Sequence, residues 1–170
     1  MSIRIVGTDI DGVWTDGGMY YDNAGNEWKR FNTYDAAGVN LLKKFQIEFF
    51  VITGEKTKIV KRRMKKLNVK HVFQGIKNKY ETVNKILQIN SFLWNELAYI
   101  GDDVNDYEVL KRAGLSACPA SAPLYIQEMV DSVVPLKGGD GVFRFFVEEL
   151  ILKKQLNLVF PDAYFQTSRI

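Results

Sequence analysis

Short apolar segments alternate with helix-forming segments along most of this chain. The apolar segments comprise residues 3–8, 49–53, 71–74, 97–101, 115–117 and 132–134, and the helix-forming segments comprise residues 36–45, 56–67, 77–87, 106–113, 123–129 and 141–154. Short, continuous apolar strands are typical of a parallel sheet that is covered on both faces. We therefore expect an α/β fold, a Rossmann-like parallel sheet with helices on both faces, as a single domain over residues 1–170.

One segment interrupts this alternation. Residues 22–26 (Asp-Asn-Ala-Gly-Asn) form a cluster of turn-forming residues between the aromatic runs 19–21 and 28–31. Aromatic runs on both sides of such a cluster predict a β-hairpin. The hairpin is expected to project near the end of the first strand.

The composition argues against several classes of protein. A hydrophobic content of 46% with 25% charged residues is ordinary for a globular chain, and a net charge of +3 does not by itself imply a nucleic-acid partner. Cys118 is the only cysteine and cannot form an internal disulfide, so a reducing cytoplasm is expected. The sequence shows no leader and no apolar run near the ~18 residues that cross a bilayer, so no membrane association is expected.

Two carboxylates mark the end of the first strand. Asp9 and Asp11 are one residue apart and precede Gly12. In a strand their side chains point to the same face, and the carboxyl end of a parallel strand is where such sheets place their chemistry. This pair can hold a divalent cation and still offer an oxygen for nucleophilic attack. Taken alone, the pair also fits surface carboxylates in a turn.

Two later strand ends carry groups suited to an anion. Thr53 and Gly54 end the second apolar run, and a hydroxyl with nearby backbone N–H groups at a helix start can bind a phosphate. Lys79 opens the next helix, where a cation opposes the helix dipole unless an anion lies nearby. A routine strand exit and a solvated lysine remain the alternatives for these two signals.

A fourth strand end concentrates negative charge. Asp102, Asp103 and Asp106 lie within five residues of one another. Carboxylates packed so closely repel one another unless a cation or hydrogen bonds compensate. We favour a Mg²⁺ site here over a charged loop.

The ordered series of paired aspartates, threonine, lysine and an aspartate cluster resembles the haloacid dehalogenase-like phosphotransferases over nearly the whole chain. The resemblance implies that Asp9 is the nucleophile and Asp11 the general acid and base. It implies that Thr53, Gly54 and Lys79 hold the phosphoryl oxygens. It also implies a Mg²⁺ cofactor bound by Asp9, Asp102 and the backbone carbonyl of Asp11, with Asp103 and Asp106 as accessory groups.

The intervals between these motifs are too short for a cap domain. The interval from Asp11 to Thr53 holds only the hairpin and one helix, and that from Lys79 to Asp102 holds one helix and one strand. The chain thus resembles the capless branch, and most closely its sugar-acid phosphatases. That resemblance implies a homotetramer and a phosphorylated 2-keto-3-deoxy sugar acid as substrate: 2-keto-3-deoxynononate 9-phosphate first, 3-deoxy-D-manno-octulosonate 8-phosphate second.

The preference for the nononate depends mainly on Glu55. The octulosonate enzymes carry an arginine after the Thr-Gly pair, whereas Glu55, Arg63 and Lys66 resemble the nononate enzymes. These three side chains share one helix face and could read the substrate's hydroxyls and carboxylate. A solvated amphipathic helix explains them equally well.

Several alternatives stay open at this point. A nucleic-acid surface on the lysine-rich segment 56–67 lacks any second basic motif, so no nucleic-acid partner is expected. A non-catalytic oligomerisation module and a mutase of the same fold are further candidates. Arg144 could serve the substrate, a subunit contact or a salt bridge, and the apolar segment 156–165 could dock on the protein or stay frayed.

Overall fold

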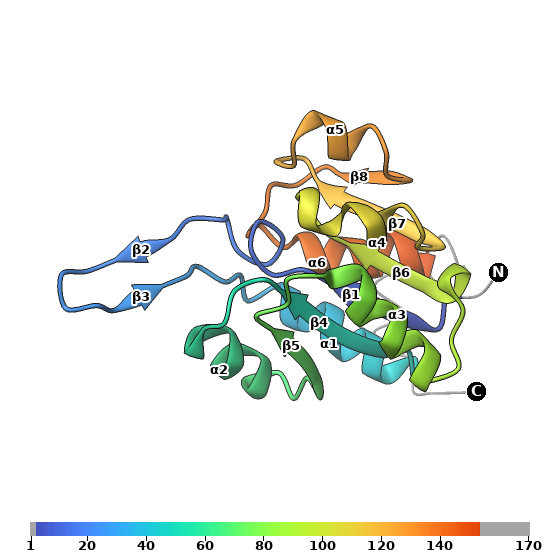
Figure 1. The fold of residues 1–170 in the computed structure, drawn as a ribbon, viewed down its shortest axis with the longest axis horizontal. Helices are drawn as coiled ribbons and strands as arrows, with labels where there is room; N and C mark the ends of the chain where they lie inside the picture. Colours follow the sequence, from blue (N-terminus) through green and yellow to red (C-terminus); the bar gives the residue numbers. More distant parts are fainter. Residues whose placement is uncertain (1–2, 154–170) are drawn as a thin grey trace.

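The sheet has the expected parallel architecture. The structure, a computed structural model, describes residues 3–153. Its main sheet has six strands in the order β5-β4-β1-β6-β7-β8, and all neighbouring pairs are parallel (Figure 1). The strands are β1 (Ile5–Thr8), β4 (Glu48–Thr53), β5 (His71–Gln74), β6 (Leu97–Ile100), β7 (Leu115–Pro119) and β8 (Ser132–Val134).

Two separate hydrophobic cores lie on the two faces of this sheet. Neighbouring residues of β1 point to opposite faces, so Val6 belongs to one core and Ile5 to the other. The Val6 core contains side chains of α1, α2, α6 and the following helical segment η3 (Phe146–Lys153), and the Ile5 core contains side chains of α3, α4 and α5. Helices therefore cover both faces, as predicted. Their bounds are α1 (Asp35–Lys44), α2 (Lys58–Lys66), α3 (Lys79–Ile89), α4 (Tyr107–Leu110), α5 (Leu124–Gln127) and α6 (Val142–Phe145).

Capping side chains set where two helices begin. Thr57 accepts a hydrogen bond from the backbone N–H of Val60 at 3.3 Å, and Asn78 accepts one from that of Glu81 at 3.1 Å. Each cap satisfies an N–H group that has no partner within the helix. The helices therefore start at Lys58 and Lys79, each two residues later than predicted.

Helix type is where the prediction differs from the structure. The final helix, predicted over 141–154, is α6 followed by a π-helical segment, η3 (Phe146–Lys153). The helix predicted over 106–113 is instead the 3₁₀ turn η2 (Val104–Asp106) followed by α4. One further 3₁₀ turn, η1 (Trp94–Glu96), precedes β6. The apolar segment 156–165 lies outside the described residues.

The predicted hairpin is present. Strands β2 (Tyr20–Tyr21) and β3 (Glu27–Trp28) pair antiparallel and extend well away from the sheet (Figure 1). Asp22 closes the turn by accepting hydrogen bonds from the backbone N–H groups of Ala24 at 2.9 Å and Asn26 at 2.8 Å. The hairpin joins β1 to α1, so its base lies at the carboxyl end of β1.

A buried carboxylate, Asp35, joins α1 to α6. Its Oδ1 accepts a hydrogen bond from the backbone N–H of Arg144 at 3.1 Å, and its side chain is fully buried. Burial raises the pKa of Asp35 from 3.8 to about 6, although hydrogen bonds from the backbone of Arg144 and Phe143 oppose this rise. Near pH 5 the folded protein therefore holds a proton at Asp35 that the unfolded chain has lost.

We expect Asp35→Asn to gain stability relative to the wild type as pH rises. The raised pKa favours folding below pH 3.8, and this contribution is lost as pH rises through about 6. The amide keeps the acceptor but does not titrate. The difference in free energy of unfolding should grow between pH 4 and 7 by up to ~3 kcal/mol. Urea denaturation of both proteins measures it, and a difference independent of pH would contradict the burial argument.

Candidate active site

The carboxyl ends of the central strands bring the predicted site residues together. Thr8, the last residue of β1, pairs with Val51 on one side and Ile100 on the other. The next residue, Asp9, donates its backbone N–H to the carbonyl of Ile100 at 3.0 Å. The segments that carry Asp9, Thr53 and Asp102 therefore meet at one edge of the sheet.

Lys79 is buried between two carboxylates. Its Nζ lies 2.9 Å from Oδ1 of Asp9 and 2.8 Å from Oδ1 of Asp106, and its side chain is 0% exposed. Burial alone would lower the pKa of Lys79, but the charges of Asp106 and Asp9 outweigh it and raise that pKa. The side chain of Lys79 is therefore a fixed positive charge next to the Asp9 carboxylate.

Asp106 organises this cluster. Besides the Lys79 ammonium, its Oδ1 accepts a hydrogen bond from the hydroxyl of Tyr99 at 2.5 Å. Its Oδ2 accepts bonds from the backbone N–H groups of Asp102 at 3.3 Å and Asp103 at 3.5 Å. Asp106 thus holds both the lysine and the turn that presents Asp102. The sequence suggested only an accessory role for it, because its distance along the chain from Lys79 hides this contact.

Three carboxylates are close enough to share a divalent cation. Oxygens of Asp9, Asp102 and Asp106 all lie within 4.8 Å of one another. Burial, and then the charge of Asp106, raise the pKa of Asp102 to about 7. Burial and the charge of Asp106 also raise the pKa of Asp9. Oxygen ligands that repel one another in this way fit a hard cation such as Mg²⁺, whose charge would favour their ionised forms.

Gly12 allows the loop after β1 to approach the cluster. Its φ is +83°, and a Cβ atom built at this position would lie 1.9 Å from Oδ2 of Asp102. Only glycine fits both the backbone conformation and the space. The backbone at Gly12, the residue after Asp11, therefore lies close to the Asp102 carboxylate.

The carboxylate of Asp11 is outside that cluster and has a partner that the sequence did not indicate. Oδ1 of Asp11 lies 2.7 Å from Nζ of Lys29, and the hydroxyl of Thr15 lies 3.4 Å from the same oxygen. Lys29 follows β3, and its side chain is only 1% exposed. A lysine within an aromatic run gave no signal for this contact, since the orientation of the hairpin decides it.

Asp9, Asp11 and Asp102 line a cavity of about 300 Å³. Thr53 and Gly54 lie in its wall and Glu55 at an exposed position of its lining. The Thr53 hydroxyl accepts a hydrogen bond from the backbone N–H of Glu55 at 3.3 Å. The full lining comprises Asp9, Asp11, Gly12, Gly17, Thr53, Gly54, Glu55, Asp102, Asp103 and Asn105.

Arg63 and Lys66 do not line this cavity. The guanidinium of Arg63 donates to the backbone carbonyl of Asn32 at 2.9 Å and lies 5.9 Å from the ring centroid of Phe31. It therefore ties α2 to the segment that follows the hairpin, while Lys66 is exposed. Arg144 donates to Glu148 at 2.8 Å, which is the salt bridge weighed from the sequence.

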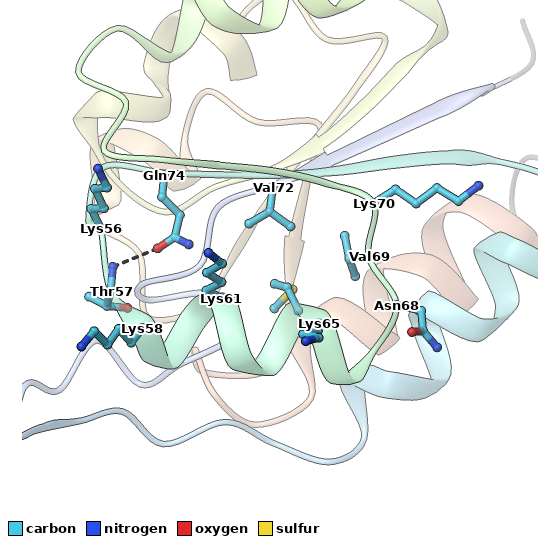
Figure 2. A pocket seen from close by; sticks show the side chains of 11 residues that line it. Lys56, Thr57, Lys58, Lys61, Lys65, Asn68, Val69, Lys70, Val72 and Gln74 are labelled. Carbon is cyan, nitrogen blue, oxygen red and sulfur yellow. Dashed lines mark hydrogen bonds between the residues drawn. The ribbon is translucent and has the colours of Figure 1, made fainter.

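A larger hollow of about 980 Å³ lies between α2 and the edge strand β5 (Figure 2). Five lysines surround an apolar floor that includes Met64 and Val72, and the backbone N–H of Thr57 donates to Gln74 at 2.9 Å across one end. The lysines are Lys56, Lys58, Lys61, Lys65 and Lys70. This hollow shares no residue with the carboxylate cavity. Within residues 3–153, no helix has the length and apolar character needed to span a bilayer.

Comparison with known proteins identifies similar hydrolases. A family profile of haloacid dehalogenase-like hydrolases matches residues 40–146. The chain is 35% identical over 151 residues to the 3-deoxy-D-manno-octulosonate 8-phosphate phosphatase KdsC of Escherichia coli K12, covering 89% of this chain and 80% of the relative. The corresponding Haemophilus influenzae protein is 33% identical over 162 residues, covering 95% and 90%.

Solved structures agree with the fold. The Moraxella catarrhalis 3-deoxy-D-manno-octulosonate 8-phosphate phosphatase, in complex with magnesium ion, phosphate ion and a KDO molecule, superposes with a TM-score of 0.89 at 31% identity, covering 95% of this chain and 91% of that one. The Yersinia pestis phosphatase gives a TM-score of 0.87 at 35% identity, covering 92% and 84%. These similarities, together with the carboxylates and the buried lysine at one edge of the sheet, show that the chain belongs to the haloacid dehalogenase-like hydrolases.

Proposed function

We propose that this chain is a Mg²⁺-dependent phosphomonoesterase that hydrolyses 3-deoxy-D-manno-octulosonate 8-phosphate through an aspartyl-phosphate on Asp9. One observation carries the reaction type: in the cavity at the carboxyl end of β1, an oxygen of Asp9 lies 2.9 Å from the Lys79 ammonium, and an Asp9 oxygen lies within 4.8 Å of an Asp102 oxygen. The substrate follows from the relatives, several of which are phosphatases of this sugar acid.

The two-step reaction assigns a task to each group. An Asp9 oxygen attacks phosphorus while Asp11 protonates the departing alkoxide, and Asp11 then takes a proton from the water that releases phosphate. Lys79, the Thr53 hydroxyl and the backbone at Gly54 hold the phosphoryl oxygens. Asp9, Asp102 and the Asp11 carbonyl would hold Mg²⁺, whose charge would offset the repulsion between phosphate and carboxylate.

The side chains needed for catalysis are together in one place, which argues against a non-catalytic module. A module that serves only assembly has no need of a lysine buried between carboxylates, because such an arrangement costs stability. We keep the single domain, the homotetramer and the cytoplasmic location as predictions from the sequence and its resemblance.

A second candidate substrate is 2-keto-3-deoxynononate 9-phosphate, which the sequence alone favoured. Glu55 supports it, since this carboxylate lines the cavity where the octulosonate enzymes are expected to carry arginine. Arg63 and Lys66 give it less support, because neither lines the cavity. The relatives named for the octulosonate phosphate therefore decide our order of preference.

We expect kcat/KM to be ~10-fold or more higher on the octulosonate phosphate than on the nononate phosphate. Steady-state release of inorganic phosphate from both substrates, with Mg²⁺ and with EDTA, measures this. Activity should disappear in EDTA and return with added Mg²⁺. Hydrolysis of neither sugar-acid phosphate would contradict the proposed function. A reversed ratio that Glu55→Arg restores would favour the second candidate.

A further inference from the structure

A buried lysine next to the hairpin strand β3, Lys29, contacts a residue that lines the cavity. Lys29 follows β3, and its Nζ lies 2.7 Å from Oδ1 of Asp11 although 18 positions separate the two residues along the chain. Aromatic side chains of the hairpin, such as Tyr20, Tyr21 and Trp28, are exposed. The Lys29 side chain is 1% exposed, so the ion pair is shielded from solvent on the lysine side.

We propose that Lys29 is the positioning residue for Asp11, so that the hairpin orients the carboxylate that acts as general acid and base. Lys29 and the Thr15 hydroxyl both bind Oδ1 of Asp11. The other oxygen, Oδ2, is buried and has no hydrogen-bond partner among the described residues. Lys29 and Thr15 thus fix the orientation of the Asp11 side chain, and Asp11 is one of the residues that line the cavity. This inference rests on the proposed role of Asp11.

The geometry argues against two simpler roles for Lys29. A clamp within the hairpin would need a close partner there, but Oε1 of Glu27 is 4.0 Å from Nζ, much farther than Asp11. A direct contact with substrate has less support, because the nearest site group to the Lys29 ammonium is Asp11 at 2.7 Å, and it is Asp11 that lines the cavity. Lys29 therefore acts through Asp11.

The chemistry of the two steps provides a way to test this. In the first step the Asp9 oxygen forms a bond to phosphorus, the bond from phosphorus to the leaving oxygen breaks, and Asp11 gives that oxygen its proton. In the second step water attacks the same phosphorus, Asp11 takes the water's proton, and the bond from Asp9 to phosphorus breaks. A nitrophenolate leaves without a proton, so an aryl phosphate needs Asp11 only in the second step.

The experiment is rapid-quench kinetics of Lys29→Met with p-nitrophenyl phosphate and Mg²⁺. We expect a burst of about one nitrophenolate per active site at the wild-type rate of the first step. The following turnover should be slower by ~100-fold, the usual contribution of a positioned acid or base. Asp11→Asn should show the same pattern. The double variant should lose no more than Asp11→Asn alone, because Lys29 acts only through Asp11.

Arg30→Met is the matched control. Arg30 is the next residue, half exposed, and ties the hairpin base to Asp140 at 2.5 Å. Its loss should leave both phases near wild type. Lys29→Gln, which keeps a polar head, tests the same prediction should the methionine variant fail to fold.

Three results would overturn the inference. One is wild-type turnover in both Lys29 variants, and another is a Lys29 effect that adds fully to that of Asp11→Asn. The third is loss of the burst together with turnover, which would show a structural role. A wild-type protein that hydrolyses neither sugar-acid phosphate would overturn the proposed function as well, so the two failures are distinguishable.

Discussion

Replacing Asp9 with asparagine should abolish turnover of phosphate monoesters and leave the fold intact. The amide has no anionic oxygen to attack phosphorus, so kcat should fall by at least ~10³-fold. Burial and the charge of Asp106 raise the pKa of Asp9, which means that its ionised form is unfavourable in the folded protein. The free energy of unfolding should therefore stay equal or rise. Steady-state phosphate release with Mg²⁺ and urea denaturation measure the two effects.

An acid quench separates loss of the nucleophile from a general defect. The wild type, quenched during turnover of labelled substrate, should retain covalent phosphate, and Asp9→Asn should retain none. Glu108→Gln is the matched control, since Glu108 is an exposed carboxylate on α4 and should behave as wild type in every assay. An Asp9→Asn protein with a tenth or more of wild-type turnover would eliminate the covalent mechanism.

Strand positions followed directly from the sequence. Short apolar runs between helix-forming segments predict parallel strands, and the runs at 71–74 and 132–134 match the edge strands β5 and β8 residue for residue. The form of the final helix was not predictable in this way. Both an α-helix and a π-helix satisfy the same apolar pattern over short stretches, so the change at Phe146 depends on packing against the rest of the protein.

The candidate site likewise has one part that the sequence predicted and one part that it did not. Parallel strands bring their carboxyl ends to one edge, so the order of Asp9, Thr53, Lys79 and Asp102 along the chain already indicated their convergence. Arg63 lay on the predicted face of α2, but its partner is the carbonyl of Asn32. That contact, like the one between Lys29 and Asp11, depends on how a projecting hairpin packs on the domain. No local pattern in the sequence encodes that packing.

Lys79→Met should damage both activity and stability. The substitution removes the ammonium that Asp9 and Asp106 share at 2.9 and 2.8 Å, and it leaves these carboxylates buried without that cation. Breaking a buried ion pair from one side typically costs ~3–5 kcal/mol, which urea denaturation would detect. With the phosphoryl oxygens also deprived of a positive charge, kcat should fall at least ~100-fold.

Lys85→Met is the matched control for Lys79→Met. Lys85 lies on the same helix, α3, and is exposed, so its loss should change neither kcat nor the free energy of unfolding beyond ~0.5 kcal/mol. Added Mg²⁺ should recover part of the stability lost in Lys79→Met, because a cation held by Asp9 and Asp102 offsets the repulsion among these neighbouring carboxylates. It should not recover turnover, since the ammonium that holds the phosphoryl oxygens is still absent. Lys79→Met with wild-type kcat would place the phosphate elsewhere in the cavity.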